Sequence, residues 1–158
     1  MPAAPDIPEP VRFDDADPAT AYNRVWFNLL RIQRSMAPRI SRALKGAGIE
    51  DPVWYEILLE VEKAGAEGIR MAELESRLFV AQYALSRHVA RIEAAGFVRR
   101  DGQEEGRRGR TLFITGKGLG LHDSIWPAYV EAIQSELRHR LSTDEAYALC
   151  RLLIRLYP

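Results

Sequence analysis

Three helix-like patterns followed by two strand-like runs occupy the stretch between Asp51 and Thr115. In the helix-like segments the apolar residues recur at spacings of three and four, as in amphipathic helices. These segments are 52–64, 72–79 and 82–95. The strand-like runs, 97–100 and 111–115, flank a charged loop that contains glycines. A winged helix-turn-helix has this order of elements: a helix, a short helix, a tight turn, a further helix and a charged hairpin.

Longer helical patterns stand on both sides of this stretch. Apolar residues at helical spacing predict a helix from Pro18 to Leu44, and a second one that runs from the glycine-rich segment 116–120 to about Arg140. We interpret the segment 116–120 as a turn between strand and helix. A capping box of Ser142 and Glu145 predicts the start of a last helix. The expected fold is mainly α-helical with a small β-hairpin.

These patterns suggest a division of the chain into four parts. Residues 1–17 are rich in prolines and acidic residues and are expected to be a disordered N-terminal arm. They lack the basic start and the apolar run of a secretory signal. Residues 18–50 form a dimerisation helix, residues 51–116 a winged helix-turn-helix domain, and residues 117–158 the C-terminal dimerisation helices. The apolar stripes of the outer helices would be exposed in a single chain, which favours a homodimer.

The charge distribution indicates where a polyanion would bind. The 158 residues carry 22 basic and 22 acidic side chains, so the formal net charge is zero. Seven arginines and four acidic residues lie between Gln82 and Arg110, whereas five acidic residues and one lysine lie between Asp51 and Ile69. A local basic surface attracts phosphates even when the whole molecule is neutral. A solvated surface that happens to use arginine is the alternative.

The helix 82–95 is the expected DNA-reading element. Its apolar face would pack on the domain, and its opposite face would carry groups that bond to base edges and phosphates. The expected DNA contacts are Gln82, Tyr83, Ser86, Arg87 and, at the phosphate backbone, Arg91. In the hairpin loop, Arg107 and Arg108 are expected to reach a neighbouring minor groove.

Three segments resemble the multiple antibiotic resistance regulator (MarR) family. They are 85–100 (LSRHVARIEAAGFVRR), 106–109 (GRRG) and 113–118 (FITGKG), and the resemblance extends over roughly residues 19–157. It implies a homodimer formed by the first and the last two helices, which binds a pseudo-palindromic operator in double-stranded DNA and acts as a repressor.

By this resemblance, Ser86 and Arg87 match recognition-helix positions that contact DNA, and Arg108 matches the wing arginine. Where the family usually has an acidic residue two places before that arginine, this chain has Gly106. Glu105 is adjacent, but an orienting acidic partner for the wing arginine does not follow from the sequence.

The resemblance also implies a small, often aromatic, effector bound between the dimerising helices and the winged domain. Residues that would line such a crevice are Trp26, Trp54, Tyr55, His122 and Trp126. Packing in the core or in an interface is the alternative role for each of them.

Other function classes find little support in the sequence. No segment has the length and apolarity of a membrane span, and the single cysteine, Cys150, agrees with a reducing cytoplasmic compartment and is expected to be buried and inert. The three histidines stand in separate segments, so neither a metal nor another cofactor is expected. The sequence shows neither a nucleophile with a nearby base nor a phosphate-binding loop, so nothing in it indicates an enzyme. A winged-helix module that binds protein instead of DNA remains the alternative function.

Overall fold

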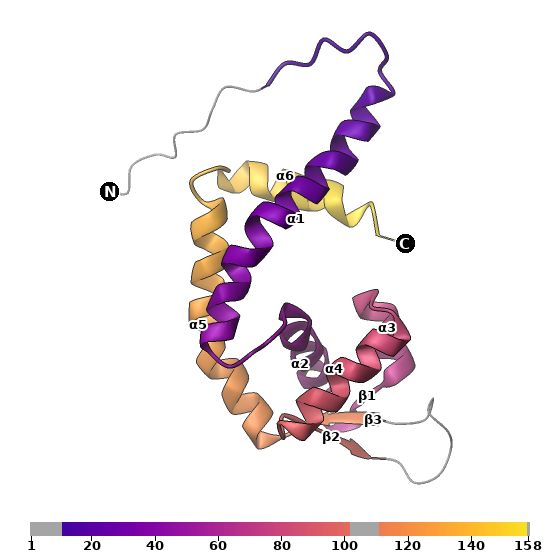
Figure 1. Ribbon diagram of the computed structural model, residues 1–158, viewed down its shortest axis with the longest axis vertical. Helices are drawn as coiled ribbons and strands as arrows, with labels where there is room; N and C mark the ends of the chain where they lie inside the picture. Colours follow the sequence, from indigo (N-terminus) through magenta and orange to yellow (C-terminus); the bar gives the residue numbers. More distant parts are fainter. Residues whose placement is uncertain (1–10, 102–110, 158) are drawn as a thin grey trace. The chain divides into compact units, whose positions relative to one another are not determined.

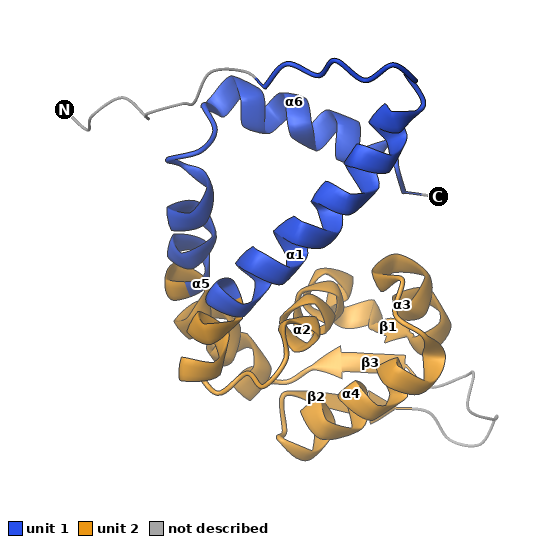
Figure 2. Ribbon diagram, turned by 45° about the horizontal axis from the view of Figure 1, so that its top comes forward, with its two compact units in different colours: residues 1–40, 129–158 blue, residues 41–128 orange. Residues whose placement is uncertain are grey.

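The computed structural model describes residues 11–101 and 111–157 (Figure 1). The chain divides into two compact units, which Figure 2 shows in different colours. Unit 1 contains residues 1–40 and 129–158, and unit 2 contains residues 41–128. Part of the expected N-terminal arm, residues 1–10, and the hairpin loop 102–110 lie outside the described residues. None of the described helices has the length and apolarity to span a membrane.

Unit 2 is the winged helix-turn-helix that the sequence predicts, and its sheet has three strands. Its helices are α2 (Pro52–Ala64), the 3-10 turn η1 (Gly65–Glu67), α3 (Met71–Leu78) and α4 (Gln82–Ala94). Its strands are β1 (Ile69–Arg70), β2 (Val98–Asp101) and β3 (Thr111–Ile114). The expected hairpin pairs Val98 with Ile114, and β1 adds a third antiparallel strand by pairing Ile69 with Leu112.

Backbone geometry at single residues explains how these elements begin and end. Asp51 caps α2, because its side chain accepts a hydrogen bond from the backbone N–H of Val53 at 3.0 Å. Gly68, before β1, has a φ of +66° and lies so close to β3 that a Cβ atom there would be 2.7 Å from the carbonyl oxygen of Leu112. Only glycine fits both the conformation and the space, so β1 joins the sheet at this point.

The core of unit 2 is made of aliphatic side chains from every helix and strand. At most 2% of the surface of each is exposed. They are Leu44, Ile49, Ile57, Leu58, Val61, Ile69, Leu74, Leu85, Val89, Ile92, Val98, Leu112 and Ile125. Burial of this apolar surface holds α3 and α4 on α2 and the sheet.

The expectation that residues 116–120 form a turn is wrong. They are the first residues of helix α5 (Gly116–Leu137). The hydroxyl of Thr115 accepts a hydrogen bond from the N–H of Gly118 at 3.1 Å and lies 2.7 Å from the carbonyl oxygen of Gly96, to which it donates. This capping satisfies an amide at the start of the helix, so three glycines in the first turns are tolerated.

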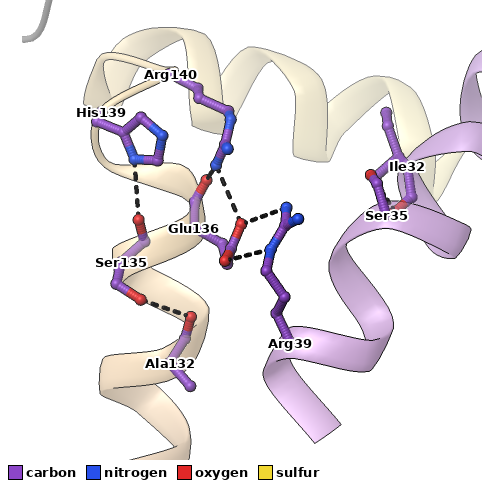
Figure 3. A network of polar contacts seen from close by, with 8 residues as sticks. All are labelled: Ile32, Ser35, Arg39, Ala132, Ser135, Glu136, His139 and Arg140. Atoms are coloured by element: carbon purple, nitrogen blue, oxygen red, sulfur yellow. Dashed lines mark hydrogen bonds and ion pairs between the residues drawn. The ribbon is translucent and has the colours of Figure 1, made fainter. Parts of the chain in front are cut away.

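Unit 1 consists of most of α1 (Thr20–Gly46), the second half of α5 and α6 (Thr143–Ile154). The capping box at the start of α6 is present as predicted, with Ser142 and Glu145 each bonding to the other's backbone N–H. Arg39 of α1 and Glu136 of α5 form two parallel hydrogen bonds of 2.6 and 2.8 Å (Figure 3). This pair holds the two helices side by side at that level.

The expectation that Cys150 is buried is wrong for the single chain. Its side chain is exposed, because α6 contains no buried residue among those the structure describes. An apolar helical stripe predicts that a helix buries one face, but no described residue of this chain covers this face of α6.

Candidate nucleic-acid interface

A tight turn sets the angle between α3 and α4. Phe79, directly after α3, has the left-handed conformation, with φ 53° and ψ 29°. Its backbone N–H donates to the carbonyl of Glu75, and α4 begins after Val80 and Ala81. The two helices are thereby joined by a turn short enough to hold α4 rigidly against the rest of unit 2.

One face of α4 is anchored and the other is exposed. Leu85, Val89 and Ile92 are fully buried, and they fix the rotation of the helix about its axis. The residues expected to contact DNA on this helix lie on the surface. They are Gln82, Tyr83, Ser86, Arg87 and Arg91, all of which are exposed. Their side chains are therefore free to meet an external partner.

The arginine side chains of this unit differ in whether they already form ion pairs or ring contacts within the chain. The side chain of Arg87 has no ion pair or hydrogen bond with any residue that the structure describes. Arg91 lies 3.6 Å from the carboxylate of Glu50, and both side chains are more than half exposed. Arg100 pairs with Glu93 at 2.9 Å, and Arg99 lies over the ring of Phe113 at 4.3 Å. Of these four arginines, Arg87 is the one whose side chain has no partner among the described residues.

The base of the wing is described, and its tip is not. Strands β2 and β3 pair up to Asp101 and Thr111. The expected wing contacts Arg107 and Arg108 lie outside the described residues, as do Gly106 and Glu105.

Three of the five residues expected at an effector site lie together. Tyr55 of α2 stacks on His122 and Trp126 of α5, with ring centroids 5.4 and 6.0 Å apart. The Nδ1 atom of His122 is 3.0 Å from a carboxylate oxygen of Glu62, which also belongs to α2. Trp126 is 45% exposed, so the stack reaches the surface.

The other two residues of that set are elsewhere. Trp26 belongs to unit 1 and is 59% exposed. Trp54 is only 5% exposed, and its indole N–H donates to the Nδ1 atom of His88 on α4 at 3.2 Å. Sequence reasoning treated His88 as an isolated histidine, because the contact depends on how α2 and α4 cross.

Comparison with family models matches residues 47–109 to the MarR family. The matched segment makes up less than half of the chain. The match covers α2, α3, α4 and β2, ends before β3, and agrees with the resemblance drawn from the sequence. MarR proteins are transcription regulators and not enzymes, in agreement with the expectation that this chain is no enzyme. No curated protein matches the chain.

Solved structures extend the MarR likeness to the fold of nearly the whole chain. A MarR family transcriptional regulator of Streptomyces coelicolor, solved in complex with DNA, has a TM-score of 0.77 and 21% identity over 94% of this chain and 91% of its own. A mutant MarR of E. coli complexed with operator DNA has a TM-score of 0.75 and 20% identity over 90% of this chain and 100% of its own. MarR of Staphylococcus aureus in complex with salicylate and kanamycin has a TM-score of 0.72 and 14% identity over 87% of this chain and 90% of its own.

Proposed function

We propose that this chain is a transcription regulator that binds a pseudo-palindromic operator in double-stranded DNA as a homodimer and represses transcription there. The observation that carries the proposal is the exposed face of α4, which is held by three fully buried residues and presents the unpaired Arg87. A helix anchored in this way enters the major groove with its polar face toward the bases.

Each side chain on this face has a distinct expected partner. Arg87 forms two hydrogen bonds to a guanine and Gln82 two to an adenine, while the hydroxyls of Tyr83 and Ser86 bond to phosphate oxygens. Arg91 contacts the phosphate backbone. Arg107 and Arg108 of the wing are proposed to enter the adjacent minor groove.

The apolar surface of unit 1 supports the homodimer. A groove of about 630 Å³ lies between α1 and α6. The apolar residues along it are Phe13, Ala21, Val25, Leu29, Ile32, Leu149, Leu152, Leu153 and Leu156. Several of these are exposed, including Val25 at 51%, Leu152 at 57% and Leu156 at 60%. Exposed apolar surface of this extent marks an interface, and a two-fold partner would cover it.

A small aromatic effector is proposed to bind beside the stack of Tyr55, His122 and Trp126. The partly exposed indole of Trp126 offers a face for a further ring, and the pair of His122 and Glu62 offers polar partners. Because the stack joins α2 to α5, a ligand there would change how these two helices pack on each other. Trp54 and Trp26 are not part of this proposed site.

Selection of bound fragments from random or genomic DNA tests the DNA-binding function. Wild-type protein should enrich a sequence with two inverted half-sites centred about 34 Å, or a small multiple of it, apart. The Arg87→Ala variant should enrich this sequence more weakly and lose the preference for one base of each half-site. If replacement of Arg87 and Arg108 by alanine leaves the retention of genomic fragments unchanged, and this retention does not depend steeply on salt, a winged-helix module that binds protein would be favoured instead.

A ligand screen tests the effector. Salicylate and related aromatic acids should raise the melting temperature of the wild-type protein and release it from the selected operator. A Trp126→Ala variant should lose this response while it keeps operator binding. Neither stabilisation nor release with any of these acids would contradict an aromatic effector at the stack.

A further inference from the structure

A small hollow on α4 contains His88, a residue that none of the proposed DNA contacts uses. It has a volume of about 90 Å³ and is lined by Ala84, Arg87, His88 and Arg91. These positions are three or four residues apart, so they form one stripe along the helix. Trp54 of α2 reaches His88, and the stripe therefore lies on the flank of α4 that meets α2. In Figure 2 the two helices are neighbours within unit 2.

The lining of this hollow is strongly biased toward hydrogen-bond donors. Arg87 and Arg91 bring guanidinium groups, and His88 brings an imidazole. Among the described residues, Glu50 supplies the one carboxylate that reaches this group, at 3.6 Å from Arg91, and both of these side chains are largely exposed. An exposed pair of this kind is weak and exchanges readily for another anion.

The contact with Trp54 fixes which nitrogen of His88 carries the hydrogen. An indole N–H only donates, so the Nδ1 atom that faces it at 3.2 Å must be the unprotonated acceptor. In the neutral ring the hydrogen is then on Nε2. Trp54 is only 5% exposed and sits on the capped helix α2, so it holds the imidazole in one orientation.

We infer that this hollow holds one phosphate of the DNA backbone, with His88 as a hydrogen-bond donor through Nε2 beside the charge of Arg91. A helix that lies in the major groove has a phosphate chain along each flank, and this stripe is one flank of α4. Trp54 acts as a positioning residue, because it sets the orientation of His88 without touching the DNA. The inference rests on the proposed DNA-binding function and adds a backbone contact to it.

Two substitutions of His88 distinguish the roles of its two ring nitrogens. In His88→Asn the side-chain oxygen lies near the former Nδ1 and keeps a partner for Trp54, but nothing replaces Nε2. In His88→Gln the amide nitrogen reaches the former position of Nε2. Binding of the selected operator should therefore weaken about tenfold in His88→Asn and recover in His88→Gln. The slope of log affinity against log salt should not change, since neither variant loses a charge.

Replacement of single phosphates by methylphosphonates identifies the partner of His88. Each phosphate of one half-site is replaced in turn, and binding of wild-type protein and His88→Asn is measured by fluorescence anisotropy. At one phosphate the loss of binding free energy caused by the methylphosphonate and the loss caused by His88→Asn should not add, because each change removes the same hydrogen bond. Trp54→Phe, which keeps the ring but lacks the N–H, should show the same coupling to the same phosphate. Melting temperatures of all variants are measured alongside.

The outcomes distinguish this inference from the proposed function. If wild-type protein selects no DNA sequence and binds no duplex, the proposed function itself is wrong. If it binds its operator and folded His88→Asn binds equally well, the phosphate site is wrong and the function stands. Additive losses at every phosphate would also contradict a direct contact by His88.

Discussion

Gly118 lies against the backbone carbonyl of Phe97 so closely that a Cβ atom added to it would be 2.2 Å from the carbonyl oxygen. The first turn of α5 therefore packs directly on the segment that leads into β2. Phe97 also receives a hydrogen bond at this carbonyl from the backbone N–H of Thr115 at 3.1 Å. The start of α5 is thus fixed to the sheet by contact between two main chains.

The Gly118→Ala variant should lower the free energy of unfolding by about 3 kcal/mol, because neither the helix nor the carbonyl can move aside without disturbing the core. Gly120→Ala is the matched control, since a Cβ atom there has nothing within 4 Å. That variant should gain up to about 1 kcal/mol from better helix propensity. Urea unfolding followed by circular dichroism measures both. Equal effects of the two changes would contradict the close packing of Gly118.

The carboxylate of Glu136 should make stability depend on pH. Its hydrogen bonds with Arg39, together with the charges of Arg39 and Arg140, hold its pKa below the ordinary 4.5 (Figure 3). A group with a lowered pKa in the folded state stabilises it above the ordinary value and loses that contribution as the pH falls through the lowered value. Thermal unfolding should show Glu136→Gln less stable than wild type at pH 7.

The difference between Glu136→Gln and wild type should shrink toward pH 3, where the wild-type carboxylate also becomes neutral. Glu131→Gln, on the same helix, is the control, because Glu131 has no ion pair with any residue in the described ranges. Unfolding is measured at one protein concentration, since association adds to stability. A difference that stays constant from pH 7 to pH 3 would refute this role of the carboxylate.

Arg87 and Arg91 should differ in what they contribute to DNA binding. Arg87→Ala should cost about 1 to 3 kcal/mol on the operator and relax the preference for one base. Arg91→Ala should weaken operator and unrelated DNA alike and reduce the salt slope by about 1, since it removes a phosphate contact. Anisotropy titrations at several salt concentrations separate the two. Identical behaviour of both variants would mean that α4 does not present Arg87 to the bases.

The apolar groove of unit 1 should determine the oligomeric state. A Leu149→Glu, Leu156→Glu double variant places charges in the groove and should convert a dimer into a monomer, as measured by light scattering after size exclusion. Two other exposed apolar residues of α6, Tyr147 and Ile154, do not line the groove, so the double change to glutamate there is the control with equal charge. A monomeric wild-type protein would contradict the homodimer.

Elements set by neighbouring residues could be predicted from the sequence. The cap of α6, at Ser142, was expected where the structure has it, because a capping side chain bonds to a backbone amide two or three residues away. The exposed face of α4 follows from the helical spacing of Leu85, Val89 and Ile92.

Features that join distant segments could not be predicted in this way. The helical start of α5 was missed because three glycines indicate a turn, and the contact between Gly118 and Phe97 that favours a helix there is not visible in the local pattern. The hydrogen bond from Trp54 to His88 depends on the crossing of α2 and α4. Cys150 was expected to be buried, and it is exposed because nothing in the described chain covers that face of α6.

Apart from the start of α5, the sequence alone determined which segments are helices and which form the hairpin, and which face of each is apolar, because these depend on backbone preferences and on spacing within a few residues. The tertiary structure decided that Ile69 and Arg70 join the sheet beside β3, that Tyr55 stacks on His122, and that His88 faces Trp54. Such pairs form only after burial of the common core brings remote segments together, so no local pattern encodes them.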